Sequence, residues 1–204
     1  MLNKIQLLTV GAAILLFAIL YFGCDTKPVT QKAIEKERAL SVESTNIEAL
    51  LLEAKATLQA NVASNILALE KQMNDATEDS LQIGFMKELS GEWYRAEHPA
   101  IAAFYAEQIA EKTATEDTWS IAGTTYTICL QRSEVEKVRS FCTNRAIAAY
   151  ENAISLNPTN VAHQTNLALV YTENPPQENP MKGILMLVDL NKKKCAINTK
   201  ETET

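Results

Sequence analysis

The chain has few of the residues on which most enzyme active sites depend. Histidine occurs only twice, as His98 and His163, at positions far apart in the sequence. The sequence contains no glycine-rich phosphate loop, no nucleophile elbow, no H-E-x-x-H motif and no C-x2-C pair. We therefore expect no enzyme activity, no cofactor and no metal site, and we interpret both histidines as turn or helix-surface residues.

Glycine and proline are also scarce, with six of each among 204 residues, whereas alanine, leucine, isoleucine, glutamate and lysine are abundant. This composition favours an all-α chain. The formal net charge is −6, and no basic run is interleaved with aromatic residues. Because duplex binding requires a clustered positive surface, we expect no nucleic-acid partner.

The chain begins with a long apolar segment. Residues 5–22 carry no charge, and as a helix they would span about 27 Å, close to the thickness of a bilayer core. We predict a signal anchor or single-pass transmembrane helix at 1–24 and a charged spacer at 25–44. Because Lys4 precedes the run, the rest of the chain is expected on the exported, periplasmic side of a bacterial envelope. The alternative is a lipid anchor at Cys24, which follows a glycine.

A long amphipathic helix is predicted at residues 45–78. Apolar residues recur there at spacings of three and four, which places them on one stripe of about eight turns: Ile47, Leu51, Ala54, Leu58, Val62, Ile66, Leu69, Met73 and Ala76. The stripe either packs against the following domain or forms a self-associating coiled-coil stem at 46–77. We favour packing, because alanine and asparagine make a weak coiled-coil seam.

Small and aromatic residues are then spaced regularly, as Trp119, Ala122, Gly123, Tyr126, Ala146, Tyr150, Ala153 and Pro158. The series resembles the tetratricopeptide repeat, W-x2-L-G-x2-Y followed by A-x3-F and proline. The resemblance implies two helices that approach closely at small residues, with aromatic rings between them. A first repeat is assigned to Gly91 and Tyr94, and a third to Leu167, Ala168 and Tyr171. We thus predict an α-solenoid of about three repeats at 79–193, followed by a polar tail at 194–204.

Cys129 and Cys142 lie nearly symmetrically about a polar turn in the second repeat. An antiparallel helix pair could bring them within bridging distance, and an exported domain would permit a disulfide. The alternative is two buried free thiols.

The resemblance also implies a groove that binds a protein or peptide partner. Counting from the small residue of each repeat assigns these groove residues: Glu88, Glu92, Arg95, Ser120, Thr124, Thr127, Thr165, Leu169 and Thr172. Chaperone-binding relatives carry lysine and asparagine at the first two positions, so we do not expect a clamp for a terminal carboxylate. The groove would instead suit a peptide that is basic at one end. Alternatively, these residues form only a solvated helix face.

The predicted function is therefore a non-catalytic, membrane-tethered scaffold for protein–protein interactions at the bacterial cell envelope. The rival is a structural protein that forms homo-oligomers through the stem at 46–77. Fold alone carries little functional weight, so the two remain open at this point.

Overall fold

The computed structural model describes residues 47–202, with side chains to residue 193. The predicted anchor at 1–24, the acylation site at Cys24 and the spacer at 25–44 lie outside the described residues. None of the described helices is long and apolar enough to cross a bilayer. The described part of the chain contains helices and no strand, which confirms the all-α prediction there.

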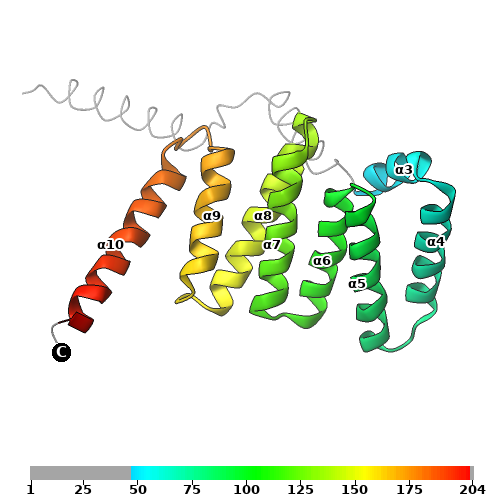
Figure 1. The fold of residues 1–204 in the computed structure, drawn as a ribbon, viewed down its shortest axis with the longest axis horizontal. Coiled ribbons are helices and arrows are strands. Elements are labelled where there is room, and N and C mark those ends of the chain that lie inside the picture. The colour runs from blue at the N-terminus through cyan, green and yellow to red at the C-terminus, as the bar shows by residue number, and fades with distance from the viewer. Residues whose placement is uncertain (1–46, 203–204) are drawn as a thin grey trace, which may run out of the picture. The chain divides into compact units, whose positions relative to one another are not determined.

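The helices follow one another without long loops. Their bounds are α3 (Ile47–Thr57), α4 (Ala60–Asp75), α5 (Asp79–Arg95), α6 (Pro99–Thr113), α7 (Glu116–Arg132), α8 (Glu136–Leu156), α9 (Val161–Glu173) and α10 (Lys182–Thr202). From α4 to α10, each helix packs mainly against its neighbours in the chain, so that the helices form a row (Figure 1). This is the arrangement of an α-solenoid. We call α5–α6, α7–α8 and α9–α10 the first, second and third helix pairs.

The prediction of one long helix at 45–78 is wrong. The chain leaves the helical conformation at Gln59, whose φ of −64° and ψ of 145° are extended. The break lets α3 pack on α6 while α4 packs on α5, which one straight helix could not do. The apolar stripe on both helices joins a core that contains Leu89 and Trp93. The stripe therefore packs within the chain, as the favoured interpretation predicted.

The turn between α5 and α6 is closed by the backbone. The amide of His98 donates to the carbonyl of Trp93 at 3.0 Å, and that of Glu97 donates to Tyr94 at 3.2 Å. These two hydrogen bonds form a Schellman motif, in which the residue after the C-cap is usually a glycine in the left-handed region. Here Glu97 occupies that position with a φ of 63°, and Pro99 starts the next helix. The tight turn holds α5 and α6 antiparallel.

The main core lies inside the second pair. Tyr126 and Tyr150 are buried to within 1% exposure, and they pack with Leu130, Phe141 and residues of α9. A Cβ at Gly123 would lie 2.8 Å from Cε1 of Tyr150. The absence of a side chain at Gly123 is therefore what admits the Tyr150 ring between the two helices.

Candidate functional site

The register of the first pair differs from the sequence prediction by one residue. Tyr94 is 37% exposed, whereas Leu89 and Trp93 are fully buried. A Cβ at Gly91 would meet only the flexible end of the Arg95 side chain, so Gly91 marks no close helix approach. The assignment of Gly91 and Tyr94 as repeat-defining residues is thus wrong. The inward stripe of α5 runs through the buried Met86, Leu89 and Trp93 and the partly buried Ser90.

This corrected series has the same spacing as Trp119, Ala122, Gly123 and Tyr126 in α7. The hydroxyl of Ser90 donates to the carbonyl of Ala102 at 2.9 Å, which fixes α6 against α5 at the small-residue position. The shift moves the positions that face the next pair. They become Lys87, Gly91 and Tyr94, in place of Glu88, Glu92 and Arg95.

A pocket of about 430 Å³ opens where α5 and α7 lie side by side. Its floor comes from Ala106 and Ile109 of α6. Its walls are formed by two helices and are lined by Lys87, Ser90, Gly91, Tyr94 and Arg95 of α5 and by Thr118, Ile121 and Thr125 of α7. Of the predicted groove residues only Arg95 lines this pocket.

The pocket combines apolar surface with positive charge. Ile121 is 58% exposed although it is a large apolar side chain. The only charged residues of the lining are Lys87 and Arg95. Arg95 pairs with Glu92 at 2.6 Å on the same helix, whereas Lys87 makes no ion pair within the described part of the chain. The guanidinium of Arg132 is 5.5 Å from the centre of the Tyr94 ring, but it pairs with Glu97 at 3.1 Å and lies outside the lining.

The other predicted groove residues lie beyond this pocket. Thr124 donates to the carbonyl of Ser120 at 2.8 Å, and Thr127 donates to that of Gly123 at 2.9 Å. Both hydroxyls also lie within 3.4 Å of the phenol oxygen of Tyr150. Their donors are therefore used inside the second pair.

In the third pair the pattern is similar. Thr165 donates to the carbonyl of Val161 at 2.8 Å, and Thr172 donates to that of Leu169 at 2.7 Å. Leu169 itself is 43% exposed. The hydroxyl donors of Thr165 and Thr172 are thus used within α9, and the methyl group of Thr172 lies against Gly183 of α10.

A second pocket, of about 410 Å³, is lined by α3, by the turn between α5 and α6, and by the end of α7. Leu50, Ala54, Ile101 and Val138 supply apolar walls. His98 also lines it, and burial lowers the pKa of this imidazole, an effect that the nearby Glu53 carboxylate partly opposes. Charges of both signs surround this pocket, so its lining favours no single ligand charge.

Cys129, which lines the second pocket, forms a disulfide with Cys142. The two Cα atoms are 6.0 Å apart, within the usual range for such a bond. Both residues are buried, at 1% and 0% exposure. The bond joins the last turns of α7 to the first half of α8. Of the two alternatives in the sequence analysis, the structure therefore contains the disulfide and not the pair of free thiols.

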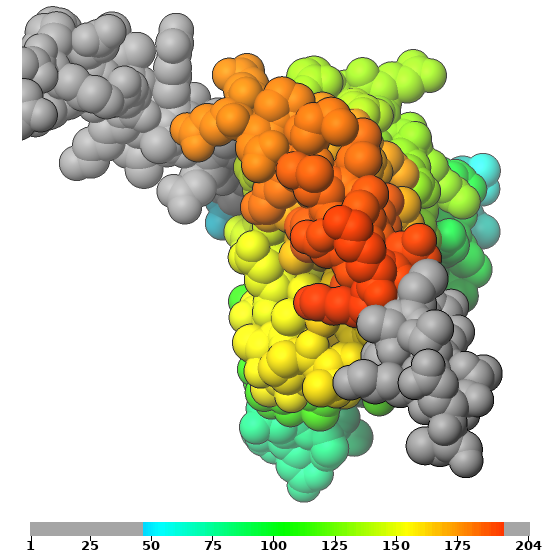
Figure 2. All heavy atoms as spheres, turned by 90° about the vertical axis from the view of Figure 1, so that its left-hand side faces the viewer, coloured from blue at the N-terminus to red at the C-terminus, as the bar shows by residue number. Residues whose placement is uncertain are grey.

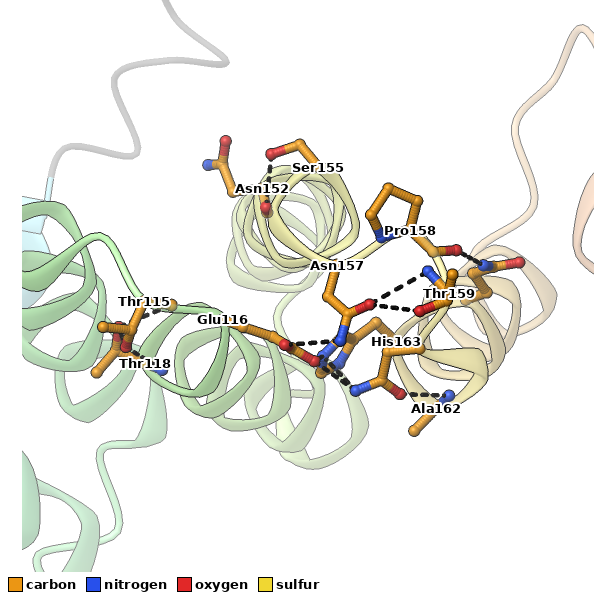
Figure 3. Close-up of polar contacts among 12 residues, drawn as sticks. Thr115, Glu116, Thr118, Asn152, Ser155, Asn157, Pro158, Thr159, Ala162 and His163 are labelled. Atoms are coloured by element: carbon orange, nitrogen blue, oxygen red, sulfur yellow. Dashed lines mark hydrogen bonds and ion pairs between the residues drawn. The ribbon is translucent and has the colours of Figure 1, made fainter.

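A polar cluster connects α7 to the third pair (Figure 3). Nε2 of His163 lies 2.6 Å from Oε1 of Glu116, and the side-chain amides of Asn160 and Asn157 also donate to this carboxylate. Hydrogen bonds from Asn160, Asn157 and His163 lower the pKa of Glu116. His163 is 5% exposed, so its interpretation as a surface residue is wrong. The cluster fastens the start of α9 to the start of α7.

A buried carboxylate was missed by the sequence analysis. Glu107 accepts a hydrogen bond from the phenol of Tyr126 at 2.6 Å and one from Arg145 at 3.1 Å. Burial, together with the negative charge of Glu107, raises the pKa of Tyr126. The repeat-like spacing alone could have pointed to Glu107, because it places this residue on the side of α6 that faces α7.

Comparison of the chain with protein-family models, with curated proteins and with solved structures gave no match. The site is therefore interpreted from its own geometry.

Proposed function

We propose that this chain is a non-catalytic scaffold of the tetratricopeptide type, and that it binds a peptide segment of its partner in the pocket between α5 and α7. The observation that carries the proposal is the lining of that pocket. An exposed isoleucine, Ile121, and the 37% exposed Tyr94 lie beside cations, of which Lys87 makes no ion pair with any described residue. An apolar surface edged by one sign of charge is typical of a peptide-recognition site.

The charge of the pocket specifies the partner. Lys87 and Arg95 are the charged residues of the lining, whereas Glu88 and Glu92 lie outside it. The segment that complements them carries an apolar side chain next to carboxylates. This reverses the basic partner that Glu88 and Glu92 suggested. In the corrected register, Lys87 occupies the first groove position of the first pair. Gly91 occupies the second position, where a clamp for a terminal carboxylate would need an asparagine. The clamp is therefore incomplete.

The membrane tether at 5–22 and a position at the bacterial cell envelope remain part of the proposal. Washing membranes with carbonate would test it, since an anchored chain stays with the lipid fraction. The rival function, self-association through 46–77, has less support. Ala54 and Ile66, which would lie in its seam, are buried to within 3% exposure against the chain's own helices.

Peptide binding can be tested with labelled nonapeptides that have a central leucine flanked by aspartates or, as the counterpart, by lysines. Fluorescence anisotropy should detect binding of the acidic peptide only. Ile121→Ser should weaken binding about tenfold, because the apolar contact is lost while the charge of the pocket stays the same. Lys87→Glu should weaken it about three- to tenfold.

Lys71 provides a matched control for the charge change, because it is exposed on α4, outside both pockets. Lys71→Glu should leave the affinity unchanged. Equal binding of both peptides, or equal loss in Lys71→Glu and Lys87→Glu, would argue against this pocket as the binding site.

A further inference from the structure

The outer side of α10 carries an apolar stripe that nothing in the described part of the chain covers. Met181, just before the helix, is 50% exposed, and Ile184, Leu185 and Val188 are 46%, 52% and 44% exposed. Their spacing of three and four places them on one face of the helix. Figure 2 looks onto this end of the row and shows the first turns of α10 in front of α9. No other described helix exposes three large apolar residues within five positions.

The first pair shows what normally covers this face. In α6, Ala102 is the small residue that contacts the preceding helix. Ala100 lies two positions before Ala102, Ala103 one position after it and Glu107 five positions after it. Each of these three residues is at most 7% exposed. They are buried because α7 packs over them, as the hydrogen bond from Tyr126 to Glu107 shows.

The third pair repeats this geometry, but none of the described helices covers it. Gly183 corresponds to Ala102, because a Cβ there would lie 2.5 Å from the carbonyl oxygen of Ala168 in α9. The residues at the same three positions relative to Gly183 are Met181, Ile184 and Val188. These residues thus occupy positions at which α6 binds a further helix. The face of α10 is built for helix packing rather than for solvent.

We propose that the occupant of this face is α10 of a second copy of the chain, packed antiparallel. The stripe is self-complementary in that arrangement. Met181 lies opposite Val188 of the second copy, and Ile184 lies opposite its Leu185. Lys192, whose side chain is 74% exposed and lies 3.9 Å from Asp189 of the same helix, adds no like-charge contact across the stripe, because both charges lie beyond its apolar residues. This proposal does not rest on the peptide-binding pocket, which lies between α5 and α7.

The size of the stripe sets the strength of the association. Stable dimers bury about 800 Å² on each partner, and four half-exposed side chains supply only part of that area. We therefore expect a reversible dimer with a dissociation constant on the order of 10–100 µM. Residues next to the stripe contribute the remainder of the contact.

Sedimentation equilibrium of the full chain in density-matched detergent tests the interface. The wild type should approach twice its 22.6 kDa mass as the concentration rises through this range. Leu185→Lys should remain at the mass of one chain. The matched control is Leu81→Lys, since Leu81 is also 52% exposed but lies on α5, and it should dimerise as the wild type does. A wild type that stays monomeric to about 500 µM, or a Leu185→Lys variant that still dimerises, would overturn the proposal.

Cysteine cross-linking tests the antiparallel direction. Met181→Cys and Val188→Cys are prepared separately in a Cys24→Ser, Cys195→Ser background and then mixed under mild oxidation. The mixture should give covalent dimers that join one variant to the other, whereas neither variant alone should cross-link efficiently. The reverse result, with each variant linking to itself, would replace the antiparallel arrangement by a parallel one and contradict the proposal.

Discussion

The second and third helix pairs each have a glycine where their two helices approach, but they are buried to very different extents. In the second pair, Gly123 meets Tyr150, and in the third, Gly183 meets the backbone of α9. The second pair then receives helices on both sides and encloses its aromatic residues. Among the described helices, the third pair receives one only on the side of α8, and α10 exposes its apolar stripe. Local spacing thus determines how two helices approach, whereas burial depends on what packs next to the pair.

The same substitution in the two pairs should show the largest contrast. Leu130 is fully buried in α7, whereas Leu185 is 52% exposed in α10. Leu130→Ala should lower the free energy of unfolding by about 3 kcal/mol, through lost burial and the cavity that remains. Leu185→Ala should change it by less than about 0.5 kcal/mol. Urea unfolding at low protein concentration, where the chain is monomeric, measures both values.

If the two variants lost similar stability, the third pair would be as well covered as the second. That result would remove the contrast and, with it, the reason to look for a partner on α10.

The disulfide is a second difference, because it lies in the second pair, whereas the side chains described in the third pair include no cysteine. It closes a short loop, since the two cysteines are 13 residues apart. Replacing both Cys129 and Cys142 by alanine should therefore lower the free energy of unfolding by roughly 3 kcal/mol. Reductant should lower the urea midpoint of the wild type and leave that of the double variant unchanged.

Thiol titration of the denatured chain is the control for this bond. The sequence contains four cysteines, so the titre should rise from two to four on reduction. An unchanged titre would show that the second pair is held by packing alone.

The smallest effect concerns the polar cluster that links the two pairs. Hydrogen bonds lower the pKa of Glu116 below its ordinary value of 4.5. The unfolded chain then binds the proton more tightly, so the stability from this carboxylate is present above about pH 4.5 and is lost as the pH falls through the lower folded pKa. The urea midpoints of the wild type and of Glu116→Gln should therefore differ most near pH 7 and converge in acid.

Glu134→Gln serves as the control, because Glu134 is an exposed residue of the turn between α7 and α8. Its midpoint should follow that of the wild type at every pH. A constant difference between Glu116→Gln and the wild type down to pH 3 would mean that the charge of Glu116 does not hold α9 to α7.

The second pair was predictable because each of its positions has one residue type that fits. Gly123 leaves room for the Tyr150 ring, Ala146 is fully buried, and Thr115 caps α7 by accepting a hydrogen bond from the amide of Thr118 at 3.3 Å. In the first pair the residue types were misleading. Gly91 and Tyr94 match the motif by identity, but Trp93 matches it by burial and Ser90 by its hydrogen bond to the carbonyl of Ala102 in α6. A one-residue shift rotates a helix by about 100°, so every groove residue derived from Gly91 moved to another face.

The site depended on contacts that no spacing reveals. Ile121 and Lys87 belong to different helices, and they share a pocket only because α5 and α7 lie side by side over α6. The hydroxyls of Thr124 and Thr127 looked available for a ligand, yet their donors are used within their own helix. The break at Gln59 was equally hidden, since an apolar stripe continues through it in the sequence.

The sequence by itself determined that the described chain is helical, that small and aromatic residues pair its helices, and that two of its cysteines are spaced for a bond. These properties arise from the conformational preferences of neighbouring residues and from contacts within one helix pair. Only the tertiary structure decided which face of α5 is buried, where cations meet apolar surface, and that α10 exposes its stripe. Those features depend on distant segments packing together, because the environment of a side chain is set by the elements around it as well as by its own helix.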